Sequence, residues 1–128
     1  MSMIYHITSR NTAFAAHQAG EYRSPSLEGE GFIHFSQLHQ VLGVANAFYA
    51  GQTDLVILVV DESRLISELK YEEPAHPTTS TSLNIPAADQ KFPHLYGPLN
   101  FEAVVAVVEL PNSTGGSFEL PAALEHNL

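Results

Sequence analysis

The architecture can be inferred first from DLVILVV, residues 54–60, in which six apolar residues follow an aspartate without interruption. A strand that is covered on one face alternates apolar and polar residues, whereas a strand that is covered on both faces is apolar throughout. Three valines and one isoleucine in the run favour a strand over a helix. We therefore predict a central β-strand here, with protein packed against both of its faces.

Further strands are predicted on both sides of this run. In the first of them, Ile4, His6 and Thr8 share one face, because successive side chains of a strand point in opposite directions. In the second, His34 points away from its apolar neighbours Ile33 and Phe35. The predicted strands cover residues 4–8, 32–35, 69–73, 92–95 and 101–110, the strand at 69–73 being expected at an edge.

Two helices are predicted in the N-terminal half. Ser9 or Asn11 can cap a short helix that ends at Gly20. Ser36 can cap a second helix, in which apolar residues recur at helical spacing as far as Tyr49 and a glycine follows two residues later. Helices near the start followed by several strands indicate an α+β fold, and too few crossover helices are present for a doubly wound parallel sheet.

The remaining segments read as connections. Residues 21–30 contain proline, serine and glycine and are expected to form a loop, and residues 74–90 are expected to form a longer one. We expect a single domain over residues 1–110 and a partly flexible C-terminal extension over residues 111–128, which contains the stretch NSTGGS.

The amino-acid composition argues against several classes of function. Five Lys and Arg against fourteen Asp and Glu give a formal net charge of −9, so a long nucleic acid would be repelled. The chain has no cysteine, which excludes disulfides and a cysteine-based zinc site. No apolar run approaches the roughly 20 residues that span a bilayer, and no signal peptide is recognisable. We expect a cytoplasmic protein without membrane association.

Three of the seven histidines, His6, His34 and His94, lie in predicted strands. Taken singly, each is better explained as a hydrogen-bonded core residue. As a set they form a pattern, because a hydroxyl residue on the same face follows each histidine two positions later; these residues are Thr8, Ser36 and Tyr96. We expect the three histidines to converge within roughly 10 Å and to line one small-molecule cleft. The other four, His17, His39, His76 and His126, are assigned to solvent.

The second predicted helix begins beside His34, and a helix N-terminus favours an anion. Ser36 could bind a phosphate or carboxylate there, or it could serve only as a cap. Arg10 and Arg23 flank the strands that carry His6 and His34, so they are the available partners for an anionic ligand, or else two solvated arginines. The sequence therefore predicts a small anionic ligand.

The sequence gives less support to two other kinds of site, a metal centre and a serine hydrolase site. Three imidazoles with Glu72 or Glu73 could form a His-ligated metal enzyme, but no local pair of ligands fixes such a site, so we expect no metal. A serine hydrolase lacks support, because Ser36 is not in a G-x-S-x-G turn and no aspartate is placed to orient His34 or His94.

The motifs IYHITSR (4–10), GFIHFS (31–36) and FPHLYGPL (92–99) together resemble the DUF 952 family, a small bacterial domain of unknown function. The resemblance covers the chain to about Leu110. It implies a fold similar to the ADP-ribosyltransferase superfamily, with a split, mostly antiparallel sheet around a cleft for NAD, and so NAD as a substrate.

Carried over by position, the resemblance gives His6 the role of contacting a ribose, and it places His34 and Ser36 at the second-strand position of the cleft. Glu102 is the candidate for the late-strand carboxylate, but His94 stands just before it, so the sequence departs from the His-Tyr-Glu pattern of that superfamily. A histidine-rich site is more similar to the RNA 2′-phosphotransferase branch.

We therefore predict that the domain binds or transforms NAD or a phosphorylated nucleotide, with an ADP-ribosyl- or phospho-transferase-like activity left open. A non-catalytic ligand-sensing or partner-binding module is the alternative. The roles of Glu72, Glu73 and Glu102 stay open. The predicted catalytic residues are His34, His94 and His6, and the predicted ligand-binding residues are Thr8, Arg10, Arg23, Ser36 and Tyr96.

Overall fold

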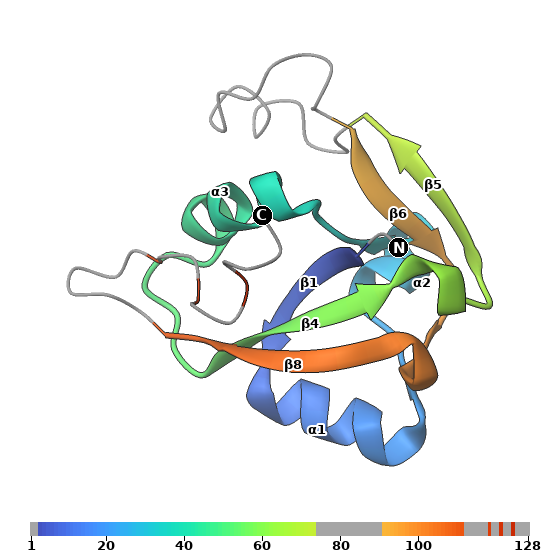
Figure 1. Cartoon of the computed structure of the whole chain (residues 1–128), viewed down its shortest axis with the longest axis horizontal. Coiled ribbons are helices and arrows are strands. Elements are labelled where there is room, and N and C mark those ends of the chain that lie inside the picture. Colours follow the sequence, from blue (N-terminus) through green and yellow to red (C-terminus); the bar gives the residue numbers. More distant parts are fainter. Residues whose placement is uncertain (1–2, 74–90, 112–117, 119–120, 122–123, 125–128) are drawn as a thin grey trace.

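The computed structural model describes residues 3–73, 91–111, 118, 121 and 124 (Figure 1). Short 3₁₀ helices at Glu62–Arg64 and Phe101–Ala103 accompany the main elements. In chain order the main elements are β1 (Met3–Ser9), α1 (Arg10–Ala19), β2 (Glu21–Tyr22), α2 (Pro25–Glu30), β3 (Ile33–His34), α3 (Leu38–Phe48), β4 (Leu55–Asp61), β5 (Glu68–Glu72), β6 (Phe92–Tyr96), β7 (Leu99–Asn100) and β8 (Val104–Leu110).

Strand β4 is central, as its sequence predicts. It lies between β1 and β8 and pairs antiparallel with both, and every one of its residues is buried. Its alternate side chains enter two separate cores: Val56, Leu58 and Val60 in one, Ile57 and Val59 in the other. The continuous apolar run is therefore required because neither face of the strand meets water.

The two cores lie on opposite faces of this sheet. Helix α1 contributes Ala13 and Ala16 to the first core, which also receives residues of the second sheet described below. Helix α3 contributes Val41 and Ala45 to the second core, where Phe118 from the C-terminal extension is also buried. Figure 1 shows α1 and α3 on either side of the β1-β4-β8 sheet.

The second sheet has the order β3-β6-β5, and β2 and β7 form a further short pair; all pairings are antiparallel. Tyr5 and Ser36 join the first sheet to the second. The Tyr5 N–H donates to the Ser36 carbonyl at 2.9 Å, and the Ser36 N–H donates to the Tyr5 carbonyl at 2.7 Å. The structure is thus α+β with separate antiparallel sheets, as predicted.

The prediction of a loop over residues 21–30 is wrong, since this segment contains β2 and α2. Ser24 caps α2 by accepting a hydrogen bond from the Ser26 N–H, Pro25 begins the helix, and Gly31 ends it with a φ of 91°. These residue types favour helix ends as well as loops. The described residues therefore hold three helices in the N-terminal half, where two were predicted.

The cap of α3 also differs from the prediction. Ser9 caps α1 and Gly20 ends it, as expected, but Gln37 rather than Ser36 is the N-cap of α3. The Gln37 N–H donates to the Gln40 side chain at 2.8 Å, which completes a capping box. Ser36 does not cap the helix because the helix begins one residue later than predicted, at Leu38, and the backbone of Ser36 pairs with Tyr5.

The strand predicted over residues 101–110 begins later, at Val104, because Phe101–Ala103 forms a 3₁₀ turn after the short strand β7. Glu102 lies in that turn and is exposed. The predicted loop at 74–90, the NSTGGS stretch, His76 and His126 lie outside the described residues. In the part of the chain that the structure describes, no helix is long and apolar enough to cross a membrane.

Candidate functional site

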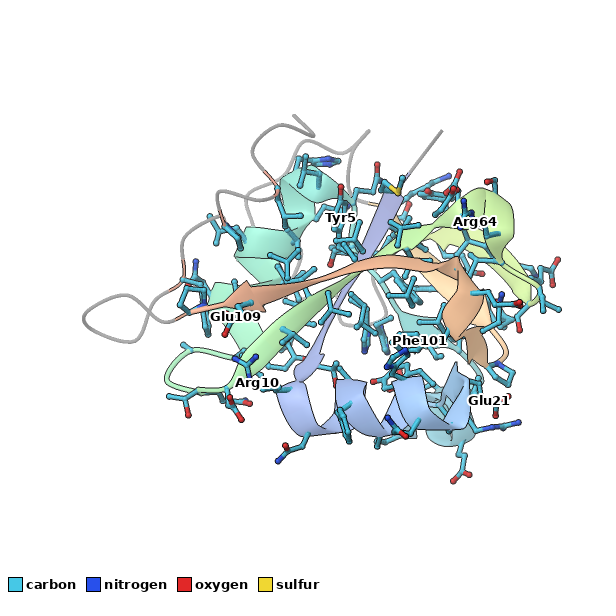
Figure 2. The ribbon with its side chains drawn as sticks, turned by 60° about the horizontal axis from the view of Figure 1, so that its bottom comes forward. Tyr5, Arg10, Glu21, Arg64, Phe101 and Glu109 are labelled. Atoms are coloured by element: carbon cyan, nitrogen blue, oxygen red, sulfur yellow. The ribbon has the colours of Figure 1, made fainter. Side chains whose placement is uncertain are left out.

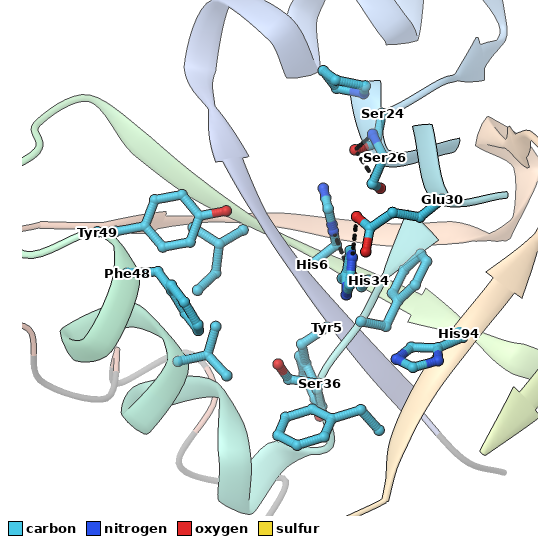
Figure 3. A pocket seen from close by; sticks show the side chains of 15 residues that line it. Tyr5, His6, Ser24, Ser26, Glu30, His34, Ser36, Phe48, Tyr49 and His94 are labelled. Carbon is cyan, nitrogen blue, oxygen red and sulfur yellow. Dashed lines mark hydrogen bonds and ion pairs between the residues drawn. The ribbon is translucent and has the colours of Figure 1, made fainter. Parts of the chain in front are cut away.

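A pocket of about 470 Å³ lies where the two sheets meet (Figure 3). Its apolar wall comes from both sheets and from α3, and includes Phe35, Val44, Phe48 and Phe92. Its polar lining comes from β1, α2, β3 and β6, and includes His6, Ser24, Glu30, His34, Ser36 and His94. An apolar cavity with a few convergent polar groups is the usual form of a small-molecule site.

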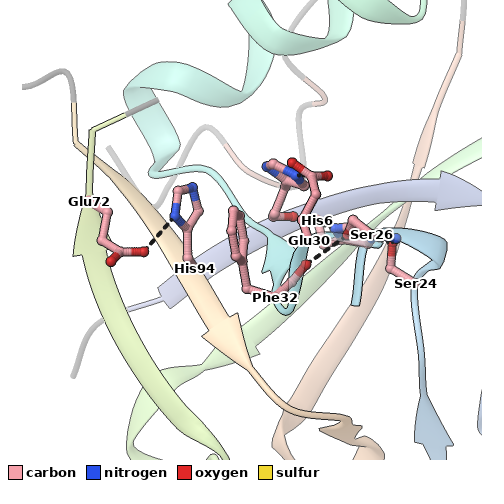
Figure 4. Close-up of polar contacts among 8 residues, drawn as sticks. His6, Ser24, Ser26, Glu30, Phe32, Glu72 and His94 are labelled. Carbon is pink, nitrogen blue, oxygen red and sulfur yellow. Dashed lines mark hydrogen bonds and ion pairs between the residues drawn. The ribbon is translucent and has the colours of Figure 1, made fainter. Parts of the chain in front are cut away.

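His94 is the most unusual residue in this lining. Its side chain is buried, with 2% relative exposure for the residue as a whole. The ring Nδ1–H donates to Glu72 Oε1 at 2.9 Å, and the Tyr96 hydroxyl donates to the same oxygen at 2.5 Å. Figure 4 shows the His94 ring held between Glu72 and Phe32. The carboxylate therefore fixes both the orientation and the tautomer of the imidazole.

Because Nδ1 carries the proton, Nε2 of His94 has a lone pair and accepts hydrogen bonds. Among the residues that the structure describes, none donates to this nitrogen. A buried polar atom without a partner is uncommon in folded proteins and calls for an explanation. Burial lowers the pKa of His94, and the hydrogen bond to Glu72 opposes this effect. The hydrogen bond from Tyr96 and then that from His94 lower the pKa of Glu72.

A second histidine–carboxylate pair lies beside the first. His34 Nε2–H donates to Glu30 Oε2 at 3.0 Å, an interaction between α2 and β3. The ring centroids of His34 and His94 are 5.4 Å apart. Phe32 contacts both rings: its ring centroid lies 4.9 Å from that of His34 and 4.2 Å from that of His94, on which it stacks. Strand pairing produces this arrangement, because His34 and His94 are direct partners in the β3–β6 register.

His6 lines the same pocket but differs in its bonding. Its Nδ1–H donates to the His34 carbonyl at 2.6 Å, and its Nε2 accepts from the Tyr22 hydroxyl at 2.8 Å. Burial lowers the pKa of His6 to about 4, so the ring is neutral near pH 7. With both nitrogens occupied, His6 cannot bind a ligand without losing an internal hydrogen bond. The three predicted histidines do line one pocket.

The other predicted residues are divided. Ser36 lines the pocket. Thr8 hydrogen-bonds the Tyr22 hydroxyl, next to His6. The Tyr96 hydroxyl donates a hydrogen bond to Glu72, the carboxylate that also binds His94, so Tyr96 affects His94 only through Glu72. The structure therefore brings Ser36 into the lining and places Thr8 and Tyr96 around the histidines.

The two arginines lie outside the pocket. Arg10 is exposed and pairs with Asp54 at 2.9 Å and with Glu109 at 2.5 Å (Figure 2). Arg23 pairs with Glu21 at 2.6 Å. Neither contributes to the lining. They flank the site strands in sequence, but carboxylates outside the pocket hold their side chains away from it.

Of the two acidic residues of the site, Glu72 was predicted only as a possible metal ligand, and Glu30 was not identified from the sequence. Glu30 lies four residues before His34, a spacing that could have suggested the pair. Glu72 is 22 residues from His94, so their contact depends on the β5–β6 register. Glu73 and Glu102 are exposed and do not line the pocket. Within the described residues, no group of three or more His, Asp or Glu side chains could hold a metal ion.

The fold and the pocket define a small α+β domain with a histidine-lined cavity between two antiparallel sheets. The chain belongs to the DUF952 family, described as a protein of unknown function, whose model matches residues 7–107. The family resemblance read from the sequence is confirmed.

Solved structures of the protein CC0527 from Caulobacter crescentus are similar to this chain. The crystal structure has 30% sequence identity and a TM-score of 0.74, and the match covers 93% of this chain and 95% of that one. The solution NMR structure has 31% identity and a TM-score of 0.71, covering 98% and 97%. A search of curated proteins finds no match. These neighbours support the α+β fold, and they do not show the similarity to ADP-ribosyltransferases.

Proposed function

We propose that the pocket binds a small molecule and that His94 acts on it as a general base. The observation that carries this proposal is the buried Nε2 of His94, which lines the pocket without a partner in the described part of the chain. A ligand hydroxyl or N–H placed in the pocket would satisfy that nitrogen. A buried imidazole that titrates below its ordinary range is also the unprotonated form that a base requires near pH 7.

The two carboxylates complete the acid–base step. When Nε2 takes a proton from a ligand hydroxyl, the imidazolium that forms keeps its Nδ1–H bond to Glu72, and the carboxylate stabilises the new positive charge. His34, at 5.4 Å between ring centroids, is close enough to contact the same ligand, and Glu30 orients it. His94 is thus the proposed base, Glu72 its positioning residue, and His34 the second group that donates or accepts a proton.

The proposed ligand is NAD or another nucleotide. A pocket of about 470 Å³ fits part of such a molecule, and the aromatic wall with Phe48 and Tyr49 suits a flat ring. The DUF952 motifs, which imply a fold similar to the ADP-ribosyltransferase superfamily, are the reason for choosing NAD. With NAD, the oxygen of an attacking hydroxyl would form a bond to the ribose C1 as the bond between nicotinamide and ribose breaks, nicotinamide would leave as a neutral molecule, and His94 would accept the proton of the attacking hydroxyl.

The experiment is to incubate the protein with NAD and to measure released nicotinamide and, separately, binding by calorimetry. We expect Glu72→Gln to lower turnover at least ~100-fold while binding changes little, because the amide cannot stabilise the imidazolium. Glu73→Gln is the matched control, since Glu73 is adjacent and exposed and does not line the pocket. Equal loss in both variants would contradict the role of Glu72.

Two other outcomes separate the alternatives. Binding without any turnover would contradict catalysis and favour a ligand-sensing module that uses the same pocket. Absence of both binding and turnover with NAD and with mononucleotides would contradict the nucleotide proposal as a whole.

A further inference from the structure

The charge of the pocket indicates which part of a ligand it accepts. The whole chain has five Lys and Arg residues, and the structure describes all of them. None of the five lines the pocket. Arg and Lys side chains are the strongest phosphate-binding groups of proteins, and the lining lacks both.

The basic side chains are engaged elsewhere. Arg10 pairs with two carboxylates and Arg23 with one, as described above. Arg64 lies 3.6 Å from Asp61. Lys70 lies on β5, with its Nζ 5.1 Å from the centroid of the Tyr96 ring. The fifth is Lys91, which is exposed. None of the five Lys and Arg side chains therefore supplies a cation to the lining.

Backbone N–H groups offer little compensation. Helix α3 begins beside the pocket, where the Gln40 side chain accepts from the Gln37 N–H and the Gln40 N–H donates to the Gln37 carbonyl. Helix α2 has six residues, and the Ser24 side chain accepts a hydrogen bond from its first turn. The anion site predicted at the start of the second helix thus has part of its donors already used.

The lining contains a carboxylate instead. Glu30 lines the pocket and pairs with His34, and a second carboxylate, Glu72, lies behind His94. Together with the net charge of −9, these groups repel a phosphate and favour an uncharged or cationic ligand. Two polar groups of the lining, the Glu30 carboxylate and the lone pair of His94, act as acceptors, while the serine hydroxyls can donate or accept, so the pocket suits a ligand that donates hydrogen bonds.

We infer that the pocket holds a nucleoside-type group, uncharged or cationic and carrying hydroxyls, and that any phosphate of the ligand stays outside it. Ribose hydroxyls donate to His94 and Glu30, and the flat base lies against the aromatic wall. This inference rests on the proposed function and narrows the ligand class within it. The sequence predicts an anionic ligand. The inference replaces it with a ligand whose phosphate, if it has one, is not bound by the pocket.

The test compares nicotinamide riboside, which is cationic and lacks phosphate, with nicotinamide mononucleotide, by isothermal titration calorimetry. We expect the riboside to bind at least as tightly as the mononucleotide, with little dependence on salt. Binding of the mononucleotide more than ten-fold tighter than the riboside would overturn the inference and leave the proposed function intact. Failure of both compounds to bind would overturn the proposed function and the inference with it.

Two variants sharpen the result. Glu30→Gln removes the lining carboxylate, so we expect the riboside to bind about ten-fold more weakly while the mononucleotide binds no more weakly than before. Glu28→Gln is the matched control, because Glu28 lies on the same helix and does not line the pocket. Lys70→Met should change neither affinity. Selective loss of mononucleotide binding in Lys70→Met would show that Lys70 reaches the phosphate, and it would overturn the inference.

Discussion

His6 and His94 are both buried histidines at the wall of one pocket, yet their surroundings differ in one respect. Both ring nitrogens of His6 are bonded inside the protein, to the His34 carbonyl and the Tyr22 hydroxyl. His94 has one nitrogen bonded to Glu72, and the other has no partner in the described part of the chain. Burial is similar, at 7% and 2% exposure, so burial does not separate them.

This difference in hydrogen bonding is a criterion for distinguishing a structural histidine from a functional one. A protein gains stability from a buried polar group only when its hydrogen bonds are satisfied. His6 meets that condition and links β1 to β2 and β3. The Nε2 of His94 does not meet this condition, so the presence of a histidine at this position is better explained by a ligand than by the stability of the fold. Four predictions test this contrast, in order of decreasing effect.

The largest effect is expected from His6→Phe. The ring shape is kept, but the His34 carbonyl and the Tyr22 hydroxyl lose a buried partner, so the free energy of unfolding should fall by about 3 kcal/mol. Urea denaturation followed by circular dichroism measures it. A loss below about 1 kcal/mol would show that water replaces both bonds and that His6 is not a structural histidine.

The pH dependence of stability is the next largest effect. The pKa of folded His6 is lowered from 6.5 to about 4, so the unfolded chain binds the proton more readily. The stabilisation is complete above pH 6.5 and is lost as pH falls toward 4, which makes the protein about 2 kcal/mol less stable at pH 5 than at pH 7 from His6 alone.

His94 contributes in the same direction, because burial lowers its pKa as well. The comparison of the wild-type protein with His6→Phe therefore isolates His6. Denaturation curves at pH 5 and pH 7 should show a smaller pH dependence in the variant. The same dependence in both proteins would mean that His6 does not titrate as its surroundings imply.

The tyrosines next to the two histidines give a matched pair with a smaller effect. Tyr22→Phe leaves the buried Nε2 of His6 without a donor and should cost about 1.5 kcal/mol. Tyr96→Phe removes one bond to Glu72, a carboxylate whose side chain is 37% exposed and can bind water instead, so about 0.5 kcal/mol or less is expected. Urea denaturation measures both losses. A larger loss in Tyr96→Phe than in Tyr22→Phe would contradict the proposed difference between the two histidines.

A small effect on stability is also expected from His94→Phe. Phenylalanine keeps the stacking on Phe32 and removes a buried nitrogen without a partner, so stability should stay within about 1 kcal/mol of the wild type. Ligand binding and turnover should be lost. If instead this variant is as unstable as His6→Phe, then His94 is a structural residue, and the proposal for the pocket loses its main support.

The strands were predictable because their period is short. The uninterrupted apolar run of β4 indicated cover on both faces, and the alternation in β1 separated Ile4 and His6 from Tyr5 and Ile7, as the two cores confirm. The errors arose where one residue type serves two purposes. Serine, proline and glycine between residues 21 and 31 could mark a loop or the ends of a helix, and local sequence does not separate these outcomes.

The site was predictable only in part. The polar faces of the strands located His34 and His94, which are direct partners in the register. The Glu72 contact was not predictable, since it requires the register of β5 against β6 across 22 residues. Arg10 was misleading because closeness in sequence says nothing about a long side chain, and β4 and β8 bring Asp54 and Glu109 to it.

The paired backbones of Tyr5 and Ser36 have a further consequence for experiments. Both residues line the pocket, and their two hydrogen bonds join the first sheet to the second. Their amide protons can exchange with deuterated solvent only when this seam opens. The exchange rates of these two amides therefore record how often the sheets separate. A ligand that contacts both sheets should slow them together, so occupancy can be read without any knowledge of the reaction.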